Sequence, residues 1–159
     1  MAKLELKDFL TLANALSGVV GISLAIAGFG YAWLYIFVAM LFDYLDGRVA
    51  RASFGANEFG KQLDSLADTV SFVVAPTVVV MKLQPDLWLT VASAFFVCLG
   101  LLRLAWFNLQ GDRKHFYGLP TPPAALTVLV VNVLNPHLTA VALFLVGVAM
   151  VTPIKINKL

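Results

Sequence analysis

The stretch that decides both the fold and the site reads DYLDGRVAR from Asp43 to Arg51 and, after eight further residues, GKQLDSLAD from Gly60 to Asp68. Both segments lie among Leu, Val, Phe and Ala, so their acidic residues belong to apolar helices. An ionised carboxylate at membrane depth is costly, and it persists where it is paired, bound to metal or open to an aqueous cavity. These two segments are therefore the candidate functional site.

Helical spacing places the acidic residues of each segment on one face. The first face consists of Asp43, Asp46, Gly47 and Ala50, with Arg51 at its edge, and the second of Gly60, Asp64 and Asp68. Two adjacent helices can thus direct two carboxylates each into one cleft, whose small residues let a ligand approach closely. Four converging carboxylates need a compensating charge, and oxygen donors suit Mg²⁺ or Mn²⁺. Structural ion pairs are the alternative, which is disfavoured because too few basic residues lie at matching helical positions.

The composition outside this site is that of a membrane protein. Of 159 residues, 60% are hydrophobic and 13% are charged, and the mean hydropathy is +0.88. Apolar runs of roughly 17–25 residues, enough to span a bilayer, occur at 9–28, 31–53, 58–81, 87–109, 121–135 and 138–154. We therefore predict an all-α polytopic protein with six transmembrane helices in a single domain, residues 1–159. The segment from Met1 to Asp8 is either a short amphipathic lead at the interface or a disordered terminus.

Several local signals refine this outline. Gly28 and Gly30 predict the first turn, and Pro76 predicts an interruption or bend in the third helix. Thr121 is expected to cap the fifth helix, with Pro122 at the first helical position. Asn14 is a polar group within the first span, so it either lines a nucleotide pocket or forms an interhelical hydrogen bond.

The basic residues predict an orientation. If the amino terminus is cytoplasmic, Lys82 alone lies outside, and the other ten Lys and Arg residues lie towards the cytoplasm: Lys3, Lys7, Arg48, Arg51, Lys61, Arg103, Arg113, Lys114, Lys155 and Lys158. The acidic cleft then opens to the cytoplasm of a multi-pass protein of the cell membrane. The net charge is +2, and the distribution of the charged residues is explained by the orientation in the membrane. The charge therefore gives no reason to expect nucleic-acid binding.

The acidic pattern D-x2-D-G-x2-A-R-x8-G-x3-D-x3-D, complete from Asp43 to Asp68, resembles the signature of the CDP-alcohol phosphotransferases, integral membrane enzymes of phospholipid synthesis. Three further segments resemble the phosphatidylserine synthase branch: Phe59 to Pro76, Arg103 to Asn108 and Gly118 to Ala125. The chain departs from that branch at Val73 and Trp106, where the resemblance predicts Gly and Arg. The resemblance implies transfer of a lipid phosphate group from a CDP-linked lipid to an alcohol, with release of CMP.

The resemblance also implies roles for individual residues. Metal, expected as two ions of Mg²⁺ or Mn²⁺, would be held by Asp43, Asp46, Asp64 and Asp68, and Asp68 would also take the proton of the acceptor. Nucleotide and phosphate would be bound by Asn14, Asp46, Gly47, Ala50, Arg51 and Gly60. Arg103 either extends to the lipid headgroups or points into the cleft and binds an anion, and the resemblance favours the cleft. The acceptor would then meet Arg103, Arg113 and Lys114, the basic residues that the chain offers near the cleft. A homodimer is implied as well.

The resemblance favours CDP-diacylglycerol or CDP-archaeol as donor and L-serine as acceptor. Glycerol phosphate and inositol phosphate remain alternative acceptors, although a phosphate would call for a cluster of Arg and Lys. A divalent-cation transporter is an alternative of another class, since it too can place four Asp residues on a helix pair. It would not need Gly47, Ala50, Arg51 and Gly60.

Overall fold

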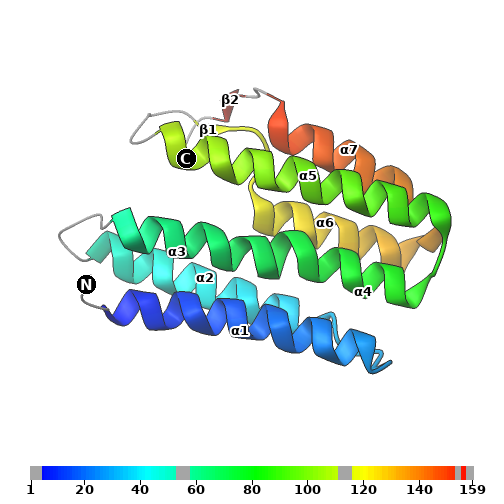
Figure 1. The fold of residues 1–159 in the computed structure, drawn as a ribbon, viewed down its shortest axis with the longest axis horizontal. Coiled ribbons are helices and arrows are strands. Elements are labelled where there is room, and N and C mark those ends of the chain that lie inside the picture. Colours follow the sequence, from blue (N-terminus) through cyan, green and yellow to red (C-terminus); the bar gives the residue numbers. More distant parts are fainter. Residues whose placement is uncertain (1–4, 53–57, 111–115, 153–154, 157–159) are drawn as a thin grey trace.

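The computed structural model describes residues 5–52, 58–110, 116–152 and 155–156. The helices are α1 (Leu6–Ile26), α2 (Leu34–Ala52), α3 (Glu58–Asp68), α4 (Ala75–Leu83), α5 (Leu87–Gln110), α6 (Thr121–Leu134) and α7 (Thr139–Val151). A π-helical segment, Thr69–Val74, joins α3 to α4, and a 3-10 turn, Pro136–Leu138, precedes α7. Two short strands, β1 (Phe116–Tyr117) and β2 (Lys155–Ile156), pair in antiparallel fashion. Within the described residues the helices form six rods, as predicted (Figure 1).

The rod made by α3, the π-helical segment and α4 lies at the centre of the bundle (Figure 1). On one side α1 packs along α2 and along this rod, and on the other side α5 packs along α7. α6 contacts α4, the π-helical segment and α7. Side chains on the central rod can therefore meet side chains from both sides of the bundle.

The faces of α1 show why this bundle belongs in a membrane. Its buried residues are mostly polar or small: Lys7, Asp8, Thr11, Asn14, Ser17, Gly18, Gly21 and Ala25. Large apolar residues are exposed on it instead: Leu6, Phe9, Leu12, Leu16, Val19 and Ile26. Lipid accommodates such exposed side chains, while small and polar residues join helices inside a bilayer. By length and composition, Leu6–Ile26, Glu58–Leu83 and Leu87–Leu109 can each cross a membrane, and the chain is a membrane protein.

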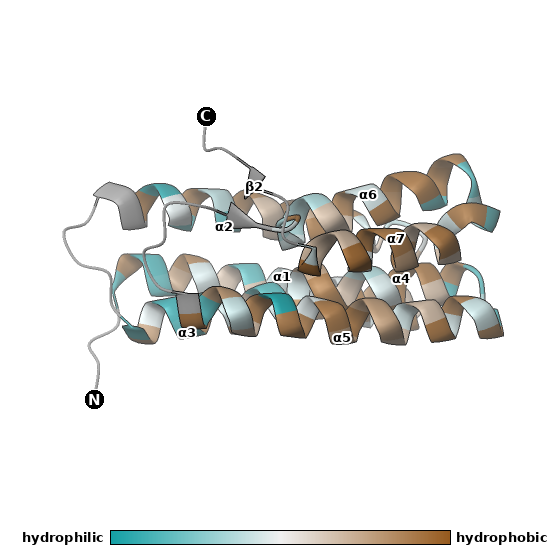
Figure 2. Ribbon diagram, turned by 90° about the horizontal axis from the view of Figure 1, so that it is seen from above, coloured by the Kyte–Doolittle hydropathy of each residue, from teal (hydrophilic) through white to brown (hydrophobic). Residues whose placement is uncertain are grey.

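Polarity is distributed unevenly along the bundle. Hydrophilic residues gather at the end where α1 and α3 begin and α2 ends, whereas the opposite half is largely hydrophobic (Figure 2). Large side chains from four different parts of the fold are fully buried in the core: Ile36, Phe72, Phe96 and Leu143. The acidic segments of α2 and α3 therefore lie towards the polar end.

The first helix begins earlier than the apolar run predicted. Glu5 is its N-cap, and the Glu5 backbone N–H donates to Asp8 Oδ2 at 2.8 Å as part of a capping box. Leu6 to Asp8, predicted as part of an amphipathic lead, therefore form the first turn of α1. Residues 1–4 of that lead lie outside the described residues.

The third predicted span is continuous, and the disturbance near Pro76 takes the form of a π-helical segment. Pro76 is the second residue of α4, where a missing N–H is tolerated, and the wider π turns precede it. Val73 in this segment is fully buried. A Cβ added to Gly100 of α5 would lie 2.7 Å from Val73 Cγ1, so the bulk at position 73 fits because α5 carries a glycine opposite it.

Candidate active site

Three carboxylates form the centre of the site. Asp43 comes from α2, and Asp64 and Asp68 come from successive turns of α3. Each offers one carboxylate oxygen, and these oxygens all lie within 4.8 Å of one another. Oxygen donors this close fit a hard divalent cation, because three like charges repel unless a cation compensates them. We name Asp43, Asp64 and Asp68 the acidic triad.

Asp46 lies one turn beyond Asp43 but outside the acidic triad. Its side chain is buried, and the Thr11 hydroxyl of α1 donates to its Oδ2 at 2.9 Å. This bond joins α1 to α2 beside the triad. The part of Asp46 in metal binding stays a prediction.

The carboxylate of Asp68 is held at both oxygens by side chains from other helices. Asn14 Nδ2 of α1 donates to Oδ1 at 3.4 Å, and the Thr121 hydroxyl of α6 donates to Oδ2 at 3.1 Å. Asn14 thus makes an interhelical hydrogen bond, one of the two roles considered for it. Its own Oδ1 is buried and has no hydrogen-bond partner among the described residues.

The start of α6 is fixed by contacts with α7. Gly118 has φ +82°, and an added Cβ there would collide with the carbonyl oxygen of Met150. The next backbone N–H, that of Leu119, donates to Ala149 O at 3.1 Å. The predicted capping role of Thr121 is wrong, because the N-cap is Pro120 and no side chain caps the helix.

Arg103 of α5 lies on the far side of Thr121. Only 7% of the residue is exposed, and Nη1 donates to Thr121 Oγ1 at 3.4 Å. Its guanidinium carbon is 5.6 Å from the centroid of the Phe107 ring. Arg103 Nε is buried and has no hydrogen-bond partner among the described residues. The Nε–H is therefore a donor that no described residue uses.

A cavity of about 540 Å³ joins these groups. It is lined by Met40, Asp43, Tyr44, Asp64, Ser65, Asp68, Arg103, Leu104, Phe107, Pro120, Thr121, Pro122, Pro123 and Leu126. Its volume is typical of small-molecule sites, which combine apolar lining with a few convergent polar groups. The acidic triad and Arg103 therefore share one binding space.

The two motif glycines differ in their surroundings. An added Cβ at Gly47 would meet no atom within 4 Å, so open space lies beside it. An added Cβ at Gly60 would lie 3.2 Å from Lys7 Cε and 3.3 Å from Asp8 Oδ1, so α1 covers that glycine. Other predicted site residues have side chains outside the described part of the chain: Ala50, Arg51, Arg113 and Lys114.

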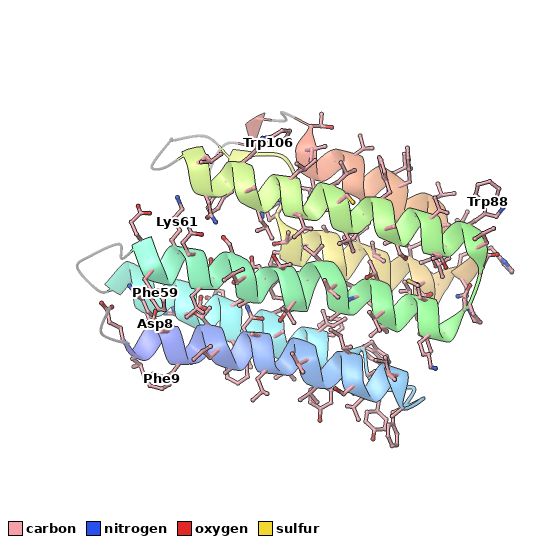
Figure 3. The ribbon with its side chains drawn as sticks, in the orientation of Figure 1. Asp8, Phe9, Phe59, Lys61, Trp88 and Trp106 are labelled. Carbon is pink, nitrogen blue, oxygen red and sulfur yellow. The ribbon has the colours of Figure 1, made fainter. Side chains whose placement is uncertain are left out.

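A second set of contacts, which the sequence alone did not reveal, joins α3 to α5 beside the cavity. Lys61 Nζ donates to the backbone oxygen of Asn108 at 2.9 Å, and Ser65 Oγ donates to Asn108 Oδ1 at 3.0 Å. Figure 3 shows Lys61 extending from α3 on the side that faces α5. The spacing of Lys61 and Ser65 at i and i+4 put them on one helical face, but it could not identify their partner.

Comparison with known proteins adds an independent finding. A family model described as CDP-alcohol phosphatidyltransferase matches residues 4–154. The chain is 41% identical over 132 residues to the archaetidylserine synthase of Methanothermobacter thermautotrophicus, a match that covers 79% of the chain and 56% of that protein.

Two further relatives are both described as CDP-diacylglycerol–serine O-phosphatidyltransferases. The protein from Methanocaldococcus jannaschii is 34% identical over 98% of the chain and 75% of its own length. The protein from Bacillus subtilis is 33% identical over 92% of the chain and 86% of its own length. The chain thus spans little more than half of the Methanothermobacter protein and most of the other two.

Proposed function

Because the chain belongs to the CDP-alcohol phosphatidyltransferase family, we propose that it transfers the phosphatidyl group, or its ether-lipid counterpart, from a CDP-linked lipid to L-serine and releases CMP. The observation that carries this proposal is the shared cavity, where the acidic triad and one buried guanidinium line the same space. The donor would be CDP-diacylglycerol or CDP-archaeol. Relatives described as serine or archaetidylserine enzymes support serine as the acceptor.

The proposed step is an in-line displacement at phosphorus. The serine hydroxyl oxygen forms a bond to the phosphorus that carries the lipid, and the bond from that phosphorus to the oxygen of CMP breaks. CMP leaves with the electron pair, and the hydroxyl proton passes to Asp68. A general base must lie within hydrogen-bond reach of the proton that it takes. Asp68 lines the cavity, and its two oxygens are oriented by Asn14 and Thr121.

The acidic triad would hold divalent metal, and we propose two ions of Mg²⁺ or Mn²⁺ with Asp46 as a further ligand. When bound, the metal would offset the charge of the pyrophosphate and of the leaving CMP. Cytidine and phosphate are proposed to contact Asn14, Asp46, Gly47, Ala50, Arg51 and Gly60. The open space beside Gly47 supports this assignment, whereas Gly60 lets α1 approach α3.

The charge of the cavity favours a carboxylate over a phosphate on the acceptor. Arg103 is the one cationic side chain among the described lining residues. A guanidinium binds a carboxylate through paired N–H donors, so Arg103 is proposed to hold the carboxylate of serine. Arg113 and Lys114, which lie outside the described residues, are proposed to assist it.

The proposed active site faces one side of the membrane. The excess of Lys and Arg towards one side favours a site that faces the cytoplasm, where cytidine nucleotides and divalent metal are available. The homodimer implied by the sequence resemblance stays a prediction.

A competition experiment tests this function. Detergent-purified protein receives one CDP-lipid, Mn²⁺ and equal concentrations of L-serine, glycerol 3-phosphate and inositol 1-phosphate, and the lipid products are identified by mass. Separate arms use CDP-diacylglycerol and CDP-archaeol. We expect the serine product. A product from a phosphorylated acceptor alone would overturn the assignment of serine as acceptor but leave the phosphotransferase activity standing. Absence of CMP release in every arm would overturn both the acceptor and the activity.

A further inference from the structure

The hydroxyl of Thr121 lies between the two groups that the proposed reaction assigns to the acceptor. It donates to Asp68 Oδ2 at 3.1 Å and accepts from Arg103 Nη1 at 3.4 Å. Thr121 is fully buried, and all three residues line the same cavity. One side chain therefore connects the proposed general base to the proposed carboxylate anchor.

The direction of these hydrogen bonds is fixed by chemistry. A guanidinium has only donors, so Thr121 Oγ1 must accept from Arg103. A hydroxyl has one proton, and that proton is left for the carboxylate of Asp68. Exchanging Thr121 for valine would keep the side-chain shape while removing both bonds.

The position of Thr121 is set from outside the site. Thr121 is the first residue of α6, and the segment that leads to it is anchored on α7 through Gly118 and Leu119. Its β-branched side chain is restricted at χ1. On the opposite side of Asp68, Asn14 holds the second carboxylate oxygen. The carboxylate thus has a defined position relative to the guanidinium.

We propose that Thr121 is a positioning residue that fixes the separation of Arg103 and Asp68, and that it thereby selects acceptors whose carboxylate and hydroxyl are spaced as in a 3-hydroxy acid. This inference rests on the proposed function, because it needs serine to meet both groups at once. The carboxylate of the acceptor would meet the guanidinium of Arg103, which lines the cavity. The hydroxyl would then meet the oriented carboxylate of Asp68.

The test compares Thr121→Val with Thr121→Ser, and with Thr127→Val as a matched control. Thr127 is on the same helix, but among the described residues its hydroxyl bonds only to Pro123 O within that helix, at 2.8 Å. We expect Thr121→Val to lower kcat/KM for L-serine by about 5- to 150-fold, as expected when buried polar groups lose a partner. Thr121→Ser should recover most of this loss, and Thr127→Val should match the wild type. CMP affinity with Mn²⁺ should be the same in the wild type and Thr127→Val, and in Thr121→Val it should fall less than kcat/KM for serine does, because Thr121 also orients Asp68.

Acceptor choice gives a readout that a purely structural role would not move. The relative use of L-serine and L-homoserine, which is longer by one methylene, is measured for each protein. We expect Thr121→Val to narrow the preference for serine, and Thr121→Ser and Thr127→Val to keep it. In a double-mutant cycle with Arg103→Ala, the losses should not add, because the two residues act through one contact.

The outcomes separate this inference from the proposed function. A wild-type protein that makes no product from serine overturns the function itself. A wild-type protein that uses serine, together with a Thr121→Val protein that keeps wild-type kcat/KM and serine preference, overturns the inference alone. Where valine at position 121 prevents folding, as judged by thermal unfolding, Thr121→Ala is used in its place. Unchanged serine preference in that variant counts equally against the inference.

Discussion

The cavity has two walls of unlike chemistry. The acidic wall, from α2 and α3, carries the acidic triad. The acceptor wall, from α5 and α6, carries Arg103 and Thr121 among apolar residues: Leu104, Phe107, Pro120, Pro122, Pro123 and Leu126. The acidic wall has carboxylate oxygens, which in the proposed reaction would bind metal and accept the serine proton, whereas the acceptor wall has one cation and a shaped apolar surface. We therefore expect that the chemical step and the choice of acceptor can be altered separately.

The two walls also differ in how the chain builds them. The acidic wall comes from residues spaced by whole helical turns on two successive helices. Local helix geometry therefore almost suffices to bring its carboxylates together. The acceptor wall depends on a contact between α5 and α6 and on the anchoring of the α6 entrance to α7. Thr121 is the point where the walls meet, because its hydroxyl belongs to one and bonds to the other.

The largest effect is expected for Asp68→Asn on the acidic wall. The change keeps the size of the side chain and removes its basicity, so turnover should fall by about 10²- to 10⁴-fold, the usual contribution of a general base. CMP affinity should fall far less. Asp86→Asn, at the N-terminus of α5 and away from the cavity, is the matched control. Near-normal turnover of Asp68→Asn with serine would reject Asp68 as the base.

A smaller effect on binding is expected for Asp64→Ala. Loss of a residue that only orients a metal ligand commonly costs 10- to 100-fold in metal affinity, so loss of a ligand should cost at least about 10-fold. Calorimetric titration of CMP with and without Mn²⁺ measures the metal-dependent part of the affinity. If this part is the same as in the wild type, Asp64 does not belong to the metal site.

The sequence predicted the acidic wall much better than the acceptor wall. Apolar runs and turn-length spacing are local properties, so the six helices and the convergence of Asp43, Asp64 and Asp68 followed from them. The partners of these carboxylates did not, because Thr11 and Thr121 reach them only through tertiary packing.

Thr121 shows the limit of local reasoning most clearly. A threonine followed by proline at the start of a helix is typical of an N-cap, yet this hydroxyl points to another helix. The π-helical segment is a similar case. Pro76 indicated a disturbance in the third helix, but it did not indicate that the disturbance would be a π-helical segment. That segment is contacted by α1, α5 and α6, which lie far from it in the sequence.

On the acceptor wall, Arg103→Ala should raise the KM for L-serine while CMP affinity stays nearly unchanged. Hydrogen bonds to charged groups contribute about 1.5–3 kcal/mol, which corresponds to roughly a 10- to 150-fold increase in KM. Initial rates over a range of serine concentrations measure this increase. Lys82→Ala, which removes an exposed cation in α4, is the control. Equal loss of CMP and serine binding in Arg103→Ala would show that the two walls are not separable.

The smallest effect is expected for Thr11→Val. This variant tests whether α1 supports the acidic wall but not the acceptor wall. The Thr11 hydroxyl bonds to Asp46 Oδ2, and this contact is the described link from Thr11 to the acidic segment of α2. Loss of one such bond costs about 0.5–1.5 kcal/mol, so thermal stability should fall slightly and metal-dependent CMP affinity by a few-fold.

The serine KM should not change in Thr11→Val, because the acceptor wall does not contact this residue in the cavity. Ser23→Ala is the matched control, since in the described part of the chain the Ser23 hydroxyl of the same helix bonds only to Val19 O, at 2.9 Å. Calorimetry with CMP and Mn²⁺ and initial rates with serine are compared for both variants. A raised serine KM with unchanged CMP affinity would show that Thr11 supports the acceptor wall. α1 would then contribute to both walls, and the division between them proposed here would be wrong.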